Sequence, residues 1–268
     1  MIILLAFLGF LVGGLVNQLG SDLPAWRKST QVGDLVDQPG SAPPARRKLT
    51  RPHCPYCGQD YALWQWLALP TYLIGRARCL NCNKRIRWRR PLVEVGLAIA
   101  YGYLWIVLGP SIKLAFYLVY AAIFALILIT DLEHRLILNV VTIPSIFLAV
   151  VASLLLPDIL LWNSLVGGAV GFFTFLLLVI VGTNLFGSGA LGEGDITLAT
   201  FVGLITGFPL VIEALVLTTF VGAVISVFLL VTRVRSLRDH IPYGPFLIIG
   251  ATITLLKGYS IADWFLQR

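Results

Sequence analysis

Residues 196–232 read ITLATFVGLITGFPLVIEALVLTTFVGAVISVFLLVT and carry one charged side chain, Glu213. A helix needs about 20 apolar residues to cross the hydrocarbon core of a bilayer, so the stretch is long enough for two crossings. A proline ends one helix and can open the next, and Gly207-Phe208-Pro209 interrupts the stretch. The stretch therefore predicts two transmembrane helices joined by a short turn.

Further apolar runs occur along the rest of the chain. Of the 268 residues, 58% are hydrophobic and 12% are charged, whereas a soluble domain has about 25% charged residues. This composition excludes a soluble globular protein and predicts an all-α polytopic membrane protein with about eight transmembrane helices. Because residues 1–19 lack the basic start of a signal peptide, we expect them to remain as the first span. The other predicted spans are 91–109, 111–130, 140–157, 164–186 and one beginning near residue 244.

Positive charge is distributed unevenly between the loops of this topology. Most of the 20 Lys and Arg residues lie in loops 20–90, 131–139 and 233–243, and cytoplasmic loops carry such an excess. We therefore expect these loops in the cytoplasm and the N-terminus outside. Because the cations lie beside apolar runs, the net charge of +7 favours anionic lipid headgroups, not nucleic acid, as the partner.

The predicted topology leaves one sizeable soluble part, an insert at 20–90 between the first span and a helical core at 91–268. The first half of the insert, 21–50, is rich in Pro, Gly, Ser and Arg and has no clear period. Such a composition predicts an extended or mobile segment. The second half holds all four cysteines of the chain.

The cysteines form two pairs, Cys54-Pro-Tyr-Cys57 and Cys79-Leu-Asn-Cys82, with 21 residues between them. Two such pairs can present four thiolates in a tetrahedron, as structural zinc requires, and Gly58 follows the first pair where a tight turn is needed. The alternatives are a disulfide or a redox role, but the cytoplasm keeps thiols reduced. We therefore expect a small zinc-ribbon-like insert whose closed metal site shapes the loop and takes no part in catalysis.

Two aspartates lie at the cytoplasmic edge of predicted spans. Asp131 follows the third apolar run and Asp195 precedes the sixth, so the topology brings both to one membrane face. The alternatives are a helix N-cap for Asp195 and a solvated loop residue for Asp131. Gly192 and Gly194 leave room beside Asp195 for the backbone of a bound substrate. Because acidic groups beside membrane spans are costly to bury, the pattern favours a catalytic pair with substrate-binding glycines.

The order of motifs along the chain resembles that of type IV prepilin peptidases, a family of membrane aspartic proteases. Besides the cysteine pairs, the matching segments are RWRRPLVE at 87–94, DLEHRLILN at 131–139, GEGD at 192–195 and IPYGPFL at 241–247. The resemblance implies that Asp131 and Asp195 are the catalytic residues. It implies an enzyme of the bacterial cytoplasmic (inner) membrane that removes a basic leader from type IV pilin or pseudopilin precursors.

The resemblance also bears on a second activity. Family members with the cysteine-bearing loop often methylate the new N-terminus as well, using S-adenosylmethionine, and no residue of this chain is assigned to that cofactor. The chain departs from the family at two positions, with Leu138 where a proline is usual and Thr197 where a lysine is usual.

An aspartyl pair works because two close carboxylates share a proton. The ionised member activates water, and the other donates to the developing oxyanion. Glu133 and Glu193 lie two residues from Asp131 and Asp195, so we expect them to contact the basic leader of the substrate. The alternative functions are a presenilin-like intramembrane aspartic protease, a non-enzymatic zinc-ribbon membrane scaffold, and a transporter.

Overall fold

The computed structural model forms two compact units, Met1–Thr130 and Asp131–Arg268. Within these units the structure describes residues 1–33, 53–54, 56–62, 65–75, 77–186, 192–232 and 242–266. Among these residues the regular elements are all helices, accompanied by isolated β-bridges. This confirms the predicted all-α class for the part of the chain that is described.

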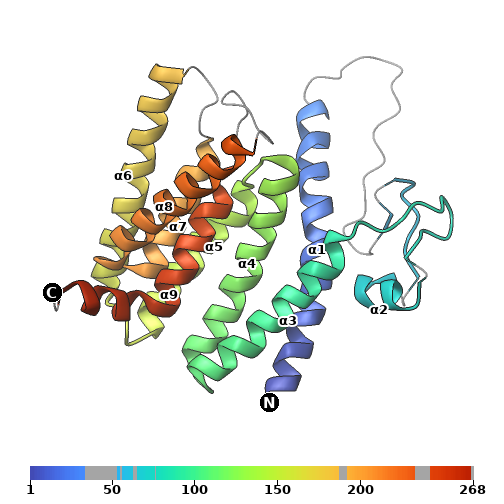
Figure 1. The fold of residues 1–268 in the computed structure, drawn as a ribbon, viewed down its shortest axis with the longest axis horizontal. Helices are drawn as coiled ribbons and strands as arrows, with labels where there is room; N and C mark the ends of the chain where they lie inside the picture. The colour runs from blue at the N-terminus through green and yellow to red at the C-terminus, as the bar shows by residue number, and fades with distance from the viewer. Residues whose placement is uncertain are drawn as a thin grey trace. The chain divides into compact units, whose positions relative to one another are not determined.

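The first unit is built on helices α1 (Ile2–Gly33) and α3 (Arg89–Leu108), which lie side by side (Figure 1). Their backbones are close because glycines of α1 face α3: a Cβ atom on Gly13 would lie 2.6 Å from Cα of Glu94. The carboxylate of Glu94 is buried and accepts the backbone N–H groups of Ala68 and Leu69 at 2.7 and 2.9 Å. These bonds attach the short helix α2 (Ala68–Leu73) to α3. The unit also holds most of α4 (Ile112–His134).

The prediction that residues 21–50 are extended is wrong at its start, because α1 continues to Gly33. At the start of the segment, polar side chains find partners one turn away in the same helix. The Ser21 hydroxyl donates to the carbonyl oxygen of Asn17 at 3.1 Å, and the Gln18 amide donates to the carboxylate of Asp22. The remainder of the predicted segment, 34–50, lies outside the described residues.

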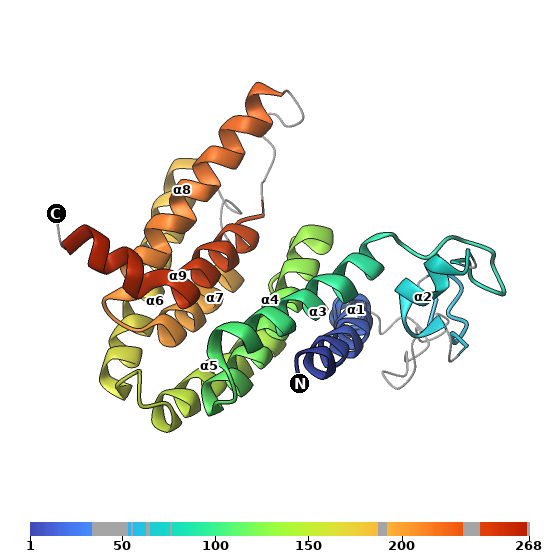
Figure 2. The ribbon, with the colours of Figure 1, turned by 60° about the horizontal axis from the view of Figure 1, so that its bottom comes forward.

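The second unit is arranged around α7 (Glu193–Thr206), which packs against four other helices (Figure 2). Several α7 side chains, among them Leu198 and Phe201, are fully buried. The crossing with α6 is close enough that a Cβ atom on Gly203 would lie 2.1 Å from the carbonyl oxygen of Gly167. The helices that surround α7 are α5 (Asn139–Leu155), α6 (Leu161–Phe186), α8 (Leu210–Val231) and α9 (Gly244–Leu266).

The predicted break in 196–232 is confirmed, since α7 ends at Thr206 and α8 begins at Leu210. Within the described residues, five helices are long and apolar enough to cross a membrane: α1, α3, α4, α6 and α8. Helices α5 and α9 contain shorter apolar stretches. Helix α7 has 14 residues, so at about 1.5 Å per residue it is shorter than the hydrocarbon core. The chain is therefore a multi-pass membrane protein with five long candidate spans.

Candidate functional site

Asp131 lies in the last turn of α4, where its side chain is buried with 5% of its surface exposed. Its Oδ2 atom accepts the backbone N–H of Gly244 at 3.0 Å. Gly244 is the first residue of α9 and belongs to the IPYGPFL segment. A Cβ atom at this position would lie only 2.5 Å from Oδ2 of Asp131. The C-terminal motif therefore contacts the first aspartate directly, and it can do so because it presents a glycine.

Asp195 is the third residue of α7 and is half-buried. Its Oδ2 atom accepts the backbone N–H of Gly192 at 3.0 Å, and its own N–H donates to the carbonyl oxygen of Gly192 at the same distance. Gly192 is thus the N-cap of α7, and Asp195 is the third residue of the helix, whose carboxylate caps the N–H of Gly192. The alternative of a capping role for Asp195 therefore holds in this form, beside the catalytic role. Burial raises the pKa of Asp195 above its ordinary value, and the N–H of Gly192 acts in the opposite direction.

The second unit brings the two aspartates together, although 63 residues separate them in the sequence. They lie close enough for the charge of Asp195 to act on Asp131. Each carboxylate is held through Oδ2 by one glycine N–H, from Gly244 for Asp131 and from Gly192 for Asp195. The site therefore holds two carboxylates, each oriented by a backbone N–H, and the charge of Asp195 acts on Asp131.

The segments that carry the aspartates also touch each other. A Cβ atom on Gly194 would lie 2.6 Å from Cβ of Ile137. The space that Gly194 leaves is therefore taken up by packing against Ile137, whether or not a substrate also approaches. Among the residues that the structure describes, no atom lies within 3.5 Å of a Cβ atom placed on Gly192, and Gly192 is exposed.

Tyr243 is a neighbour of the site that the sequence did not reveal as functional. Its ring packs edge-on against Phe175 and Phe246, with centroids 5.5 and 6.0 Å away. The pKa of Tyr243 is raised above its ordinary value, chiefly by burial. A hydrogen bond with Thr219 acts in the opposite direction, and the charge of Asp195 raises the pKa further. The aromatic group thus lies within the electrostatic reach of the second aspartate. The one sequence feature that could have pointed to Tyr243 is its position beside Gly244 in the C-terminal motif.

The two glutamates near the aspartates differ in surroundings. Glu133 is half-buried, and its Oε2 lies 3.8 Å from Nε2 of His134. Glu193 is the first residue of α7 and is exposed to solvent. In the sequence, Glu133 follows Asp131 by two residues and Glu193 precedes Asp195 by two residues.

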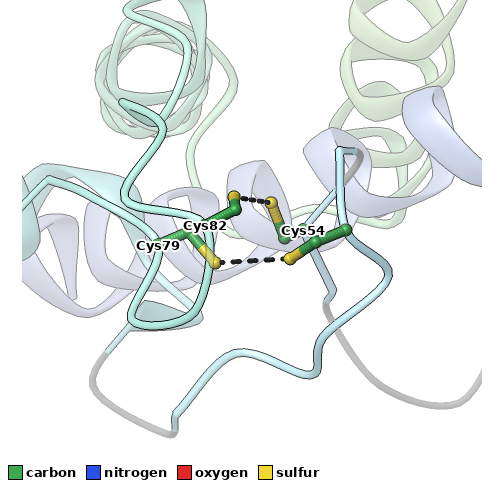
Figure 3. Close-up of side chains that lie close together, drawn as sticks. Cys54, Cys79 and Cys82 are labelled. Atoms are coloured by element: carbon green, nitrogen blue, oxygen red, sulfur yellow. Dashed lines mark hydrogen bonds between the residues drawn. The ribbon is translucent and has the colours of Figure 1, made fainter.

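The four cysteines of the insert form one cluster in the first unit (Figure 3). Their sulfur atoms all lie within 4.8 Å of one another, and Cys54–Cys82 and Cys57–Cys79 are each separated by 3.7 Å. These distances exclude disulfides, whose sulfurs are about 2.05 Å apart. They agree with the sulfur spacing of about 3.8 Å that Zn–S bonds of about 2.3 Å give in a tetrahedron. The donor set and its geometry therefore fit a metal ion such as zinc.

The backbone explains why the two pairs converge. The N–H of Gly58 donates to the carbonyl of Cys54 at 2.9 Å, and the N–H of Asn83 donates to that of Cys79 at 3.0 Å. Gly58 and Asn83 both have positive φ angles, of 73° and 54°. Each pair thus forms the same tight turn, and the turn predicted at Gly58 is confirmed. Asparagine takes the equivalent position after the second pair.

Within the cluster the thiols differ in acidity. Burial acts to raise the pKa of Cys79, but the backbone N–H groups of Cys82 and Asn81 and the neighbouring thiols lower it to about 7. The N–H of Lys84 acts to lower the pKa of Cys82, but burial and the other cysteines raise it to about 11. Cys79 therefore readily supplies a thiolate, the form in which cysteine binds metal.

Comparison with known proteins matches two peptidase family models to this chain. The Type IV leader peptidase family model matches residues 118–227, and the Bacterial Peptidase A24 N-terminal domain model matches residues 7–108. A "Prepilin leader peptidase/N-methyltransferase" of Pseudomonas aeruginosa is 28% identical over 97% of this chain and 91% of that protein. A protein of the same description from Bacillus subtilis is 25% identical over 81% of this chain and 86% of that protein. No solved structure matches the chain significantly.

Proposed function

Because the chain belongs to the type IV leader peptidase family, we propose that it is a membrane aspartic endopeptidase acting on the precursors of type IV pilins or pseudopilins. It removes their basic leader at the cytoplasmic face of the inner membrane. The relatives described as prepilin leader peptidase/N-methyltransferase, at 25 to 28% identity, support this assignment. The observation that carries it is the pairing of Asp131 and Asp195, each held by a glycine N–H.

In the proposed mechanism the two carboxylates share one proton. The ionised member accepts a proton from water as the water attacks the scissile carbonyl, and the protonated member donates to the oxygen of that carbonyl. The hydrogen bonds from Gly244 and Gly192 occupy Oδ2 of each aspartate. They leave Oδ1 of each to hold the shared proton and to orient the water.

We assign the substrate contacts to the residues beside the pair. Gly192 and Gly194 flank Asp195, and the exposed position of Gly192 suits the extended backbone of a cleavage site. Glu133 and Glu193 supply negative charge for the basic leader, with Glu193 the more accessible to it.

The membrane topology follows from the same proposal. The five long spans are completed by α5, α7 and α9 to give eight membrane-inserted helices, with the N-terminus outside and the insert and both aspartates on the cytoplasmic side. The basic loops then contact anionic lipid headgroups, with no role for nucleic acid. The arginines of loop 233–241 that contribute to this charge lie outside the described residues.

The cysteine cluster holds zinc in this proposal, through Cys54, Cys57, Cys79 and Cys82. Four thiolates complete the coordination of the ion, so its contribution is to fold the insert. The relatives' description as N-methyltransferases supports a second activity, methylation of the newly exposed N-terminus with S-adenosylmethionine. The described residues contain no glycine-rich loop after a strand that would cradle such a cofactor, so no residue is assigned to it.

The proposal is tested by incubating the purified protein, in detergent or liposomes, with a prepilin and following the shortening of the substrate. N-terminal sequencing of the product distinguishes cleavage after the leader from cleavage inside the apolar helix. The second outcome would favour a presenilin-like intramembrane protease, and an intact substrate would favour a scaffold or a transporter.

A further inference from the structure

Thr197 lies in the first turn of α7, two residues after Asp195, and has three polar neighbours. Its Oγ1 is 2.9 Å from the carbonyl oxygen of Gly194 and 3.0 Å from Oγ1 of Thr142. It is 3.5 Å from Oδ1 of Asn139, at the outer limit of a hydrogen bond. Thr142 is fully buried in the first turn of α5.

The direction of these bonds follows from what a hydroxyl can do. Each hydroxyl donates once and accepts through its lone pairs. The nearest acceptor for the Thr197 hydroxyl is the carbonyl of Gly194, at 2.9 Å. The Thr142 hydroxyl lies 3.0 Å from Thr197 and 3.5 Å from its other acceptor, the carbonyl of Leu138, so we assign Thr142 as the donor of the contact between the threonines. Two hydrogen bonds in series therefore connect α5 with the peptide group that immediately precedes Asp195.

The position of this connection matters because α5 begins only eight residues after Asp131. The intervening segment contacts the second aspartate motif at another point, where Ile137 fills the space beside Gly194. The chain leading away from Asp131 and the chain around Asp195 are thus joined at two places, one apolar and one through hydroxyls.

We propose that Thr142 and Thr197 are positioning residues for the aspartyl pair, an inference that rests on the proposed peptidase function. Their hydrogen bonds fix the first turn of α7 against α5 and so set the separation of the two carboxylates. Carboxylates share a proton only when they are held close together, and a misplacement of about 1 Å can reduce a rate about a hundredfold. The threonines act through the aspartates and do not contact the substrate. Their substitution should therefore lower kcat and leave KM unchanged.

The test compares valine and serine substitutions, since valine keeps the shape of threonine without its hydroxyl. Thr142→Val and Thr197→Val each lower kcat between about tenfold and about a hundredfold, with KM within about twofold. The double variant is no worse than the singles, because either change breaks the same chain. Thr197→Ser restores the wild-type kcat. Thr200→Val is the matched control: its hydroxyl bonds the carbonyl of Ile196 in its own helix at 2.8 Å, and kcat stays at the wild-type value.

Thermal stability of each purified variant separates misfolding from mispositioning. If Thr197→Val fails to accumulate in the membrane, Thr142→Val and Thr142→Ser give the same comparison from the other end of the bond. Valine variants with wild-type kcat, or with a change in KM alone, overturn the positioning role while leaving the peptidase function intact. A wild-type protein that cannot cleave a prepilin contradicts the proposed function itself, and the positioning role with it.

Discussion

The backbone N–H of Gly244 donates a hydrogen bond to Oδ2 of Asp131 at 3.0 Å, across 113 residues of sequence. The contact places the start of α9 against one carboxylate, just as Gly192 at the start of α7 binds the other. In both cases a backbone group does the positioning, and in both cases the residue is a glycine. The two glycines therefore orient the aspartyl pair together.

A methyl group at position 244 should disturb this arrangement. In Gly244→Ala the Cβ atom would lie 2.5 Å from Oδ2 of Asp131, so the carboxylate must move away from its hydrogen-bond donor. A displacement of this kind lowers kcat by about a hundredfold. The measurement is steady-state cleavage of a prepilin by purified variants at several substrate concentrations.

Gly96→Ala is the control for this change, because a Cβ atom on Gly96 meets nothing within 4 Å. It also introduces alanine into a helix, and it should retain wild-type kcat. Equal activity of the two alanine variants would show that the contact with Gly244 does not orient Asp131.

The cysteine cluster predicts about one zinc ion per chain, measured by elemental analysis of protein purified without chelators. Cys79→Ser removes one ligand, so the metal content falls and the insert becomes more sensitive to protease. Asn81→Ser changes the same turn without removing a thiol and keeps the metal. Peptidase activity should fall less than for substitutions at the aspartates, because the ion only shapes the insert.

Acidification should also release the metal. In the metal-free cluster the pKa of Cys79 is lowered to about 7, so protons compete more strongly for this thiolate as the pH falls. Metal binding shifts its ligands further toward the thiolate but still competes with protons. Protein that contains no metal at any pH would rule out the zinc site.

The two glutamates predict a dependence on ionic strength. Glu133→Gln combined with Glu193→Gln should raise KM for a basic leader several-fold and flatten its salt dependence, because attraction between exposed charges is screened by salt. Since Glu193 is exposed whereas Glu133 is half-buried, with Oε2 3.8 Å from Nε2 of His134, most of the effect should come from Glu193. An unchanged KM at both low and high salt would remove the glutamates from substrate binding.

Local chemistry made much of this protein predictable from its sequence. Gly207 is the C-cap of α7 and Pro209 is the N-cap of α8, and because the two occur together in one apolar stretch the break could be placed to within a residue or two. The spacing of the two cysteine pairs and the position of Gly58 are also local features, and they predict that the four thiols form one cluster.

The remainder depends on contacts between distant segments. Nothing local indicates that Gly244 bonds Asp131, or that Gly194 leaves space for Ile137. The extension of α1 to Gly33 was missed for a related reason, since polar residues there find partners that composition alone does not reveal. For Gly244 and Gly194 the tertiary arrangement decides what the local sequence leaves open, whereas in α1 the partners are local and lie one helical turn away.

We propose that Asp131 and Asp195 act as one catalytic pair, and cleavage by their asparagine variants is the decisive measurement. Asparagine has nearly the shape of aspartate but can neither share the proton nor activate water. The matched control is Asp158→Asn, which changes an exposed aspartate between α5 and α6. We predict that Asp131→Asn and Asp195→Asn insert into the membrane normally and leave a prepilin intact, while Asp158→Asn cleaves it as the wild type does. Substantial cleavage by either of the first two variants would contradict the account.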